Sequence, residues 1–245
     1  MKRLIVNADD WGRSRAETDA AWSCYQHGRI TSVSAMVFMD DSRRAAELAR
    51  DAGIDVGLHL NLTQPFSSSM PSGTQSSEHD RVVSFLNSHK YAFLLYNPAL
   101  AAQFRYDYQS QLDEFRRLYG REPSHIDGHH HQHLCTNILI GSVIPAGEKV
   151  RRSFHFWPGE KSVVNRAYRR VVDIALRRRY RVTDYFFALA QCLQRDRMRR
   201  VCALARTATV EMMAHPANSN EHNYLMSKDY LADIGPVQMG THKSG

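Results

Sequence analysis

The segment "LIVNADDWG" (residues 4–12) places an apolar strand directly before two consecutive carboxylates. Its first three residues are typical of a buried strand. The helical pattern "SRAETDAAWSCYQHG" follows, in which Ser14 and Glu17 have capping-box spacing and Gly28 supplies a helix stop. The chain therefore begins with a strand and a helix. Because a buried strand rarely ends on two charges, the acids indicate a function at the exit of that strand.

Short apolar runs and helical patterns alternate along the whole chain. The strand candidates lie at residues 3–8, 30–39, 54–62, the run that ends in 125–133, 149–154, 183–188 and 209–214. The helical patterns lie at residues 14–28, 41–53, 97–120, 137–147, 166–181 and 195–206. About seven strands separated by helices predict a mostly parallel sheet, because parallel neighbours need crossover connections. No glycine-rich phosphate loop follows the first strand, so we favour an α/β fold of the TIM-barrel-like type, a distorted β/α barrel.

The domain organisation is simple. A chain of 245 residues is long enough for one large domain, and neither a linker nor an internal repeat divides it. We expect a single domain over residues 1–240 and a frayed tail over residues 241–245. Residues 67–80, "SSSMPSGTQSSEHD", are rich in Ser, Gly and Pro and predict a loop, with movement over the site as an option.

The charge of the chain is basic, with 32 Lys and Arg against 25 Asp and Glu, a formal net charge of +7. Such a surplus suits an anionic partner. Much of it lies in Arg166–Arg181, where arginines recur at spacings of three and four, and we interpret this segment as a solvated helix face. A nucleic-acid patch is the alternative, but no recognition motif accompanies it, so no nucleic-acid partner is expected.

The location is predicted from the cysteines and from apolar segments. The four cysteines are scattered and form no CxxC pair, which indicates a reduced, cytoplasmic protein. The start "MKRLIVNADD" has too few apolar residues for a signal peptide, and no apolar stretch reaches the roughly 20 residues of a membrane span. The oligomeric state stays open, with a homodimer among the options.

Acidic or histidine side chains end four of the strand candidates. They are Asp9 and Asp10, His59, the histidines of residues 125–133, and His215. Catalytic groups of parallel β/α folds collect at the C-terminal ends of strands. Taken singly, His59 could be a hydrogen-bonded core residue, and the acid pair could cap the next helix. The four together predict a metal site.

The ligand types favour a catalytic metal. One carboxylate and two imidazoles bind Zn²⁺, Fe²⁺, Co²⁺, Ni²⁺ or Mn²⁺ and leave positions open for water and substrate. Water on such an ion loses its proton easily, and a neighbouring carboxylate can accept it. Two acids in tandem fit this chemistry, because adjacent residues at a strand exit point in different directions, so that one can ligate while the other stays free as a base.

Four motifs in this order resemble the YdjC-like carbohydrate deacetylase family, which includes chitooligosaccharide deacetylases. They are "NADDWG", "GLHLNLT", "HIDGHHHQH" and "EMMAHP", and the landmarks run from Lys2 to about Pro216. The resemblance implies a TIM-barrel-like or distorted β/α barrel, similar to polysaccharide deacetylases, that removes N-acetyl groups from amino sugars with a divalent metal. Magnesium and zinc are the ions we expect, and a small carbohydrate is the expected partner.

The resemblance also implies roles for individual residues. Asp10, His59 and His129 would hold the metal. Asp9 would be the general base, and His215 would protonate the departing amine.

Further residues near these motifs are expected to contact the substrate or to orient a metal ligand. Asp127 would orient a ligand imidazole, with a plain turn-former as the alternative. Trp11 offers a flat face for a sugar, with a core aromatic as the alternative. Asn61, His131 and His133 are also expected at the substrate.

The chain departs from the family pattern in places. Trp11 stands where the family usually has Phe, and Gly128 where it usually has Ser, which puts substrate fit and local loop geometry in doubt. Residues 147–208 carry no motif that we can align, and in such enzymes this region would help to set substrate length and type.

Three other functions remain as alternatives. His125, Asp127 and His215 mimic the two-His-one-carboxylate triad of non-haem iron oxygenases, although that interpretation leaves the acid pair unused. A metal-dependent hydrolase of a phosphoester or a cyclic amide is the second. A basic protein that binds nucleic acid and stores or senses metal is the third, and it predicts salt-dependent binding to any polyanion.

Overall fold

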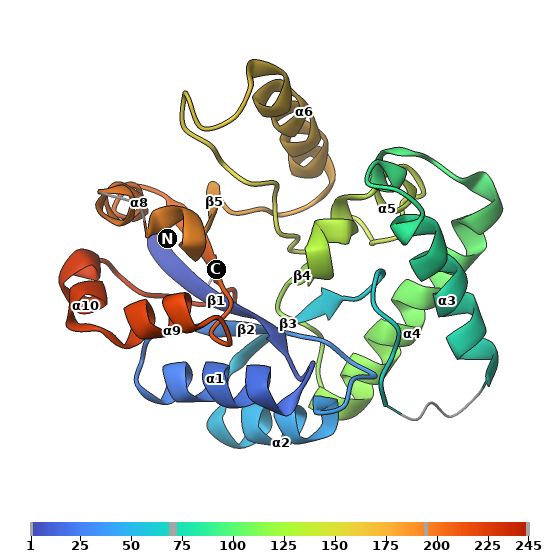
Figure 1. The fold of residues 1–245 in the computed structure, drawn as a ribbon, viewed down its shortest axis with the longest axis horizontal. Coiled ribbons are helices and arrows are strands. Elements are labelled where there is room, and N and C mark those ends of the chain that lie inside the picture. Colours follow the sequence, from blue (N-terminus) through green and yellow to red (C-terminus); the bar gives the residue numbers. More distant parts are fainter. Residues whose placement is uncertain (1, 69–72, 194–195, 244–245) are drawn as a thin grey trace.

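The computed structural model describes residues 2–68, 73–193 and 196–243. Six parallel strands form one curled sheet in the order β4-β3-β2-β1-β6-β5 (Figure 1). The strands are β1 Arg3–Trp11, β2 Ser32–Ala35, β3 Asp55–Leu60, β4 Ile126–Gly128, β5 Tyr185–Ala188 and β6 Thr209–Ala214. Every residue of β1, β2 and β3 is buried, as expected of parallel strands that are covered on both faces.

Helices surround the sheet, and the predicted α/β, barrel-like single domain is confirmed. The helices are α1 Arg15–Gln26, α2 Ser42–Ala52, α3 Gly73–Asn87, α4 Ala101–Tyr119, α5 Thr136–Ile140, α6 Val163–Arg179, α7 Leu189–Cys192, α8 Arg197–Ala205, α9 Ser219–Met226 and α10 Lys228–Ile234. The described residues also form the 3₁₀ turns η1 Ala92–Leu94, η2 Pro98–Leu100 and η3 His129–Leu134. Figure 1 shows α6 standing apart from the helices that pack along the sheet. Among the described residues, no helix has the length and apolar character needed to cross a membrane.

One predicted strand, residues 149–154, is reduced to isolated bridges. Lys149 pairs with Arg181 and Val150 pairs with Ile126, and the ladder ends there. The next two residues are arginines whose side chains are buried in ion pairs, so these contacts fix the chain in place of further strand pairing. The chain then runs along β5, where the ring of Trp157 stacks on that of Phe187 with centroids 4.7 Å apart.

The loop prediction for residues 67–80 is wrong from Gly73 onward, where α3 begins. Residues 69–72 lie outside the described residues. His79 on α3 is buried and its Nδ1 lies 2.8 Å from Oδ2 of Asp107 on α4, so contacts with α4 fix this segment despite its loop-like composition.

The described part of the C-terminal tail is packed, not frayed as expected. The backbone N–H of His242 donates to Oδ2 of Asp55 over 2.7 Å, and its ring stacks on His125 with centroids 3.7 Å apart. His242 is only 6% exposed. The tail therefore covers the ends at which the strands begin, and Met239 forms a bridge with Leu4 of β1.

Candidate metal centre and active site

A β-bulge at the end of β1 sends the two consecutive acids to different partners. The pairing of β1 with β2 shifts register between Ala8 and Trp11, and Asp10 has a left-handed backbone with φ of 64°. Such a conformation is uncommon for a residue other than glycine, and aspartate is among the residues that adopt it more readily. As a result, Asp10 contacts two histidines, whereas Asp9 contacts an arginine.

Asp10, His59 and His129, hereafter the metal group, come together as the sequence predicts. One ligand atom from each lies within 4.8 Å of the other two, and all three residues are buried. Oδ1 of Asp10 is 3.4 Å from Nε2 of His59 and 2.9 Å from Nδ1 of His129. Among the described residues, Nε2 of His129 has no hydrogen-bond partner although it is buried. A carboxylate and two imidazoles, one of which has an unpartnered nitrogen, fit a divalent cation.

The electrostatics of the metal group favour a cation. Burial alone would raise the pKa of Asp10, but the hydrogen bonds from His129 and His59 hold it far below its usual value. Burial would lower the pKa of His59, but the charges of Asp127 and Asp9 outweigh it and raise that pKa to about 10. The same negative field that attracts a proton to His59 attracts a metal ion.

Asp127 lies where the sequence expects it, behind a ligand imidazole. Its Oδ1 is 2.9 Å from Nδ1 of His59, and its Oδ2 accepts a hydrogen bond from the Ser34 hydroxyl over 2.7 Å. When the Nδ1–H of His59 donates to Asp127, Nε2 is left as the lone-pair donor that faces Asp10. This arrangement fixes the orientation of the His59 imidazole, as a metal ligand would require.

Asp9 is not free of partners, because Arg151 binds it with two hydrogen bonds. Nη1 and Nη2 of Arg151 lie 2.7 and 2.8 Å from the two Asp9 oxygens. The same guanidinium lies 2.6 Å from Asp127 and 2.6 Å from Glu211. Asp9, His59 and Asp127 also lie close enough to hold an ion, but Arg151 already supplies a cation to both of those carboxylates. Of the two groups, the metal group is therefore the better candidate to bind an ion.

Sequence reasoning missed Arg151 and Glu211. Both side chains are fully buried, and burial raises the pKa of Glu211 to about 7. Arg151 stands inside a predicted strand, and Glu211 stands inside β6 among apolar residues. A charged residue at a buried strand position is a signal that could have identified each of them.

His215 follows the last residue of β6 and is half-buried. Ala214 of β6 pairs with Ala8 of β1. The residues that come next in the two strands, His215 and Asp9, therefore lie at neighbouring strand ends. Its backbone N–H donates to Oε2 of Glu221 over 2.7 Å. The alternative oxygenase triad is not assembled, since neither His125 nor His215 belongs to a metal-binding group among the described residues.

Three residues expected at the substrate are instead fully buried. The indole N–H of Trp11 donates to the carbonyl of Ala45 over 3.1 Å, so this ring belongs to the core. The Asn61 side chain donates to the carbonyl of Gln64 and so holds its own loop. Nε2 of His133 lies 3.0 Å from the carbonyl of Arg151. Closeness to a motif does not decide which way a side chain points, and the substrate roles of these three residues stay predictions.

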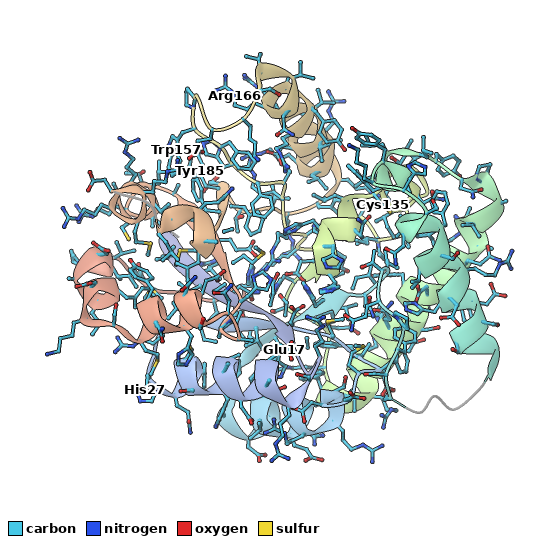
Figure 2. The ribbon with its side chains drawn as sticks, viewed as in Figure 1. Glu17, His27, Cys135, Trp157, Arg166 and Tyr185 are labelled. Atoms are coloured by element: carbon cyan, nitrogen blue, oxygen red, sulfur yellow. The ribbon has the colours of Figure 1, made fainter. Side chains whose placement is uncertain are left out.

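His131, also expected at the substrate, lines a cavity of about 630 Å³, hereafter the α6 cleft. Its walls come from η1, η3, the segment after Arg151 and α6, and they include Tyr91, Phe93, His130, His131, Tyr168 and Arg169. That volume lies within the range of small-molecule sites. The rings of His131 and Phe154 make an edge-on contact, with their centroids 4.4 Å apart. The arginine-rich segment is thus more than a solvated face: Arg166 lies at the outer edge of the molecule (Figure 2), but Arg169 faces the cleft.

Comparisons with known proteins agree with this geometry. The model of the family described as "YdjC-like protein" matches residues 3–238. A carbohydrate deacetylase of Mus musculus is 32% identical over 253 residues, covering 87% of this chain and 77% of that protein. A chitooligosaccharide deacetylase of Serratia marcescens is 36% identical over 144 residues, covering 56% of this chain and 53% of that protein. The match thus spans about half the length of that second relative.

A solved structure from Enterococcus faecalis V583, named for cellobiose-phosphate cleavage, shares the fold. Its TM-score is 0.68 at 18% sequence identity, and the superposition covers 99% of this chain and 98% of that chain. At that identity the likeness concerns the fold alone.

Proposed function

The chain belongs to the YdjC-like protein family, and on that premise we propose that it is a metal-dependent hydrolase that removes N-acetyl groups from an amino sugar or a short oligosaccharide. Relatives named as carbohydrate deacetylases support a hydrolase that acts on carbohydrates. The observation that carries the proposal is the convergence of Asp10, His59 and His129 beside the Asp9–Arg151 pair.

The metal group would hold the ion, and Asp127 would keep the imidazole of His59 in the orientation that ligation needs. Magnesium or zinc is the ion we propose. Such an ion supplies polarisation of the amide carbonyl and a more acidic water. The histidine ligands favour zinc among ions of this charge, since magnesium prefers oxygen donors.

Asp9 is the proposed general base. Its carboxylate is 3% exposed and held at both oxygens by Arg151, so its direction is set before substrate arrives. Asp9 would accept the proton of the attacking water. His215, from the adjacent strand end, would donate a proton to the departing amine, which is a poor leaving group until it is protonated.

The α6 cleft is the proposed place for the sugar. It borders η3, whose first residue is the ligand His129. Aromatic rings along its walls offer apolar faces of the kind that pack against sugars, and His131 is the predicted substrate residue that lines it. A cytoplasmic location and a homodimer stay predictions, and the four buried free cysteines support the first.

The test is acetate release from a panel of N-acetylated amino sugars and chitooligosaccharides. Enzyme stripped with a chelator should release none, and added Zn²⁺ or Mg²⁺ should restore release. Asp9→Asn should lower kcat by about 10² to 10⁴. Asp113→Asn, on the exposed face of α4, is the matched control and should leave the rate unchanged.

Acetate release that survives chelation, or that Asp9→Asn leaves intact, would contradict the mechanism. No release from any sugar of the panel would contradict the substrate class.

A further inference from the structure

A second cavity, of about 210 Å³, lies at the opposite end of the strands from the metal group. We refer to it as the basal cavity, and its lining includes Arg3, Lys149, Arg181, Asp184, Thr209 and His242. Arg3 begins β1 and Asp10 lies near its end, so the two are about 20 Å apart along the strand. The packed C-terminal tail supplies one wall through His242.

The basal cavity carries a surplus of positive charge. At its inner side Arg151 is already balanced by the carboxylates that surround it, Glu211 among them. Of the other lining residues, Arg3, Lys149 and Arg181 are cationic and Asp184 is anionic. The buried carboxylate of Asp55 acts on Lys149 and accepts a hydrogen bond from His242, and it adds a second negative charge. The difference is then one positive charge, which an anion would balance.

Two buried side chains that line the basal cavity have polar atoms without partners. Arg3 is 7% exposed, and its Nε and Nη1 have no hydrogen-bond partner among the described residues. Nε2 of the buried His242 is also without a partner in that part of the chain. Buried donors that lack acceptors are rare and unfavourable, more so when they are charged. Oxygen atoms of an anion would satisfy both side chains.

We propose that the basal cavity binds a small oxyanion of the phosphate type, at a site separate from the metal group. Arginine matches the oxygens of such an anion with directed N–H bonds, and the surplus positive charge of the cavity attracts it. The volume is smaller than that of sites for drug-sized ligands, so the occupant is inorganic phosphate or the phosphate end of a small monoester.

Calorimetric titration of the purified full chain with inorganic phosphate, at constant ionic strength set by NaCl, tests the proposal. The wild type should bind one phosphate, with a matching rise in Tm. Arg3→Gln should weaken binding by at least about tenfold, the loss expected for one charged hydrogen-bond donor. Arg43→Gln removes the same charge from the exposed surface of α2 and should bind phosphate like the wild type.

A second variant covers the case in which Arg3→Gln does not fold. Arg181 is exposed at the rim of the basal cavity, so Arg181→Gln leaves no buried gap and should also weaken binding. A parallel titration with glycerol 3-phosphate identifies the source of the phosphate group: weaker binding than inorganic phosphate indicates the free ion, and tighter binding indicates a monoester.

Three outcomes would overturn the proposal. One is a Tm rise that chloride reproduces at the same ionic strength. Another is phosphate binding that both Arg3→Gln and Arg181→Gln leave unchanged. The third is binding that is lost in Arg169→Gln, whose side chain faces the α6 cleft, and kept in the two basal variants.

Discussion

Replacing Arg151 with Met tests the electrostatics of the site most directly. The guanidinium is fully buried and contacts three carboxylates, those of Asp9, Asp127 and Glu211, over 2.6 to 2.8 Å. Removing one partner of a buried ion pair costs about 3–5 kcal/mol of stability. Because the total stability of a domain is about 5–15 kcal/mol, the variant should be strongly destabilised.

The size of the stability loss depends on how well each of the three carboxylates is stabilised without Arg151. Glu211 can take up a proton readily, because burial already raises its pKa to about 7. Asp127 keeps the hydrogen bonds from His59 and Ser34, so its charge stays supported. Asp9 loses two bonds and keeps one, from Asn7. A loss of about 4 kcal/mol, within the range for one buried charge left without its partner, is the destabilisation that we expect.

Urea unfolding at pH 5, 6 and 7 measures this loss. Each unit of lower pH should reduce the deficit of Arg151→Met by about 1.4 kcal/mol, because protonation becomes easier as pH falls. Arg151→Lys keeps the charge without the paired N–H geometry and should lose less stability. Deacetylase activity should disappear in Arg151→Met even where the protein is folded, since Asp9 loses the two hydrogen bonds that hold its carboxylate in place. A deficit that is small, or that is the same at pH 5 and pH 7, would contradict this role of Arg151.

Three further predictions concern single side chains. Asp127→Asn should weaken metal affinity about 10- to 100-fold through the lost support of His59, measured by competition with a chelating dye, and unchanged affinity would contradict the assignment. Trp11→Phe should lower the free energy of unfolding by about 1–2 kcal/mol, because it removes the hydrogen bond to Ala45, and should leave KM unchanged; a raised KM would place the ring at the substrate after all. Glu211 in the folded state keeps a proton up to about pH 7 that the unfolded state loses near pH 4.5, so stability should fall as pH rises through that window, and Glu211→Gln should flatten the slope of unfolding free energy against pH.

The alternation of strand and helix signals was enough to predict the fold, because apolar runs and helical spacing are local properties of the sequence. Contacts between distant segments decided the rest. Residues from Gly73 onward form a helix because α4 covers them, and the tail is ordered by Asp55 and His125, which lie far away in the sequence. The helices α9 and α10, after the last predicted strand, were likewise not foreseen.

A metal site could be predicted because its candidate residues end different parallel strands, and such ends meet at one edge of the sheet. The choice of Asp10, His59 and His129 among these candidates came from the family resemblance. The direction in which each side chain points could not be predicted. Trp11 follows Asp10 directly, yet the bulge turns its ring into the core. Arg151 was missed because its three partners come from three other strands, and no local pattern joins them.

The position of α6 has a consequence for how this scaffold can diversify. The residues proposed for the chemistry belong to strand ends and the turn after β4, whereas α6 contributes to the α6 cleft without contributing to the metal group. Binding preference and reactivity are therefore carried by separate parts of the chain. Randomising the inward positions Asn165, Tyr168 and Arg169 should retarget the protein to new sugars while the reaction itself is inherited unchanged.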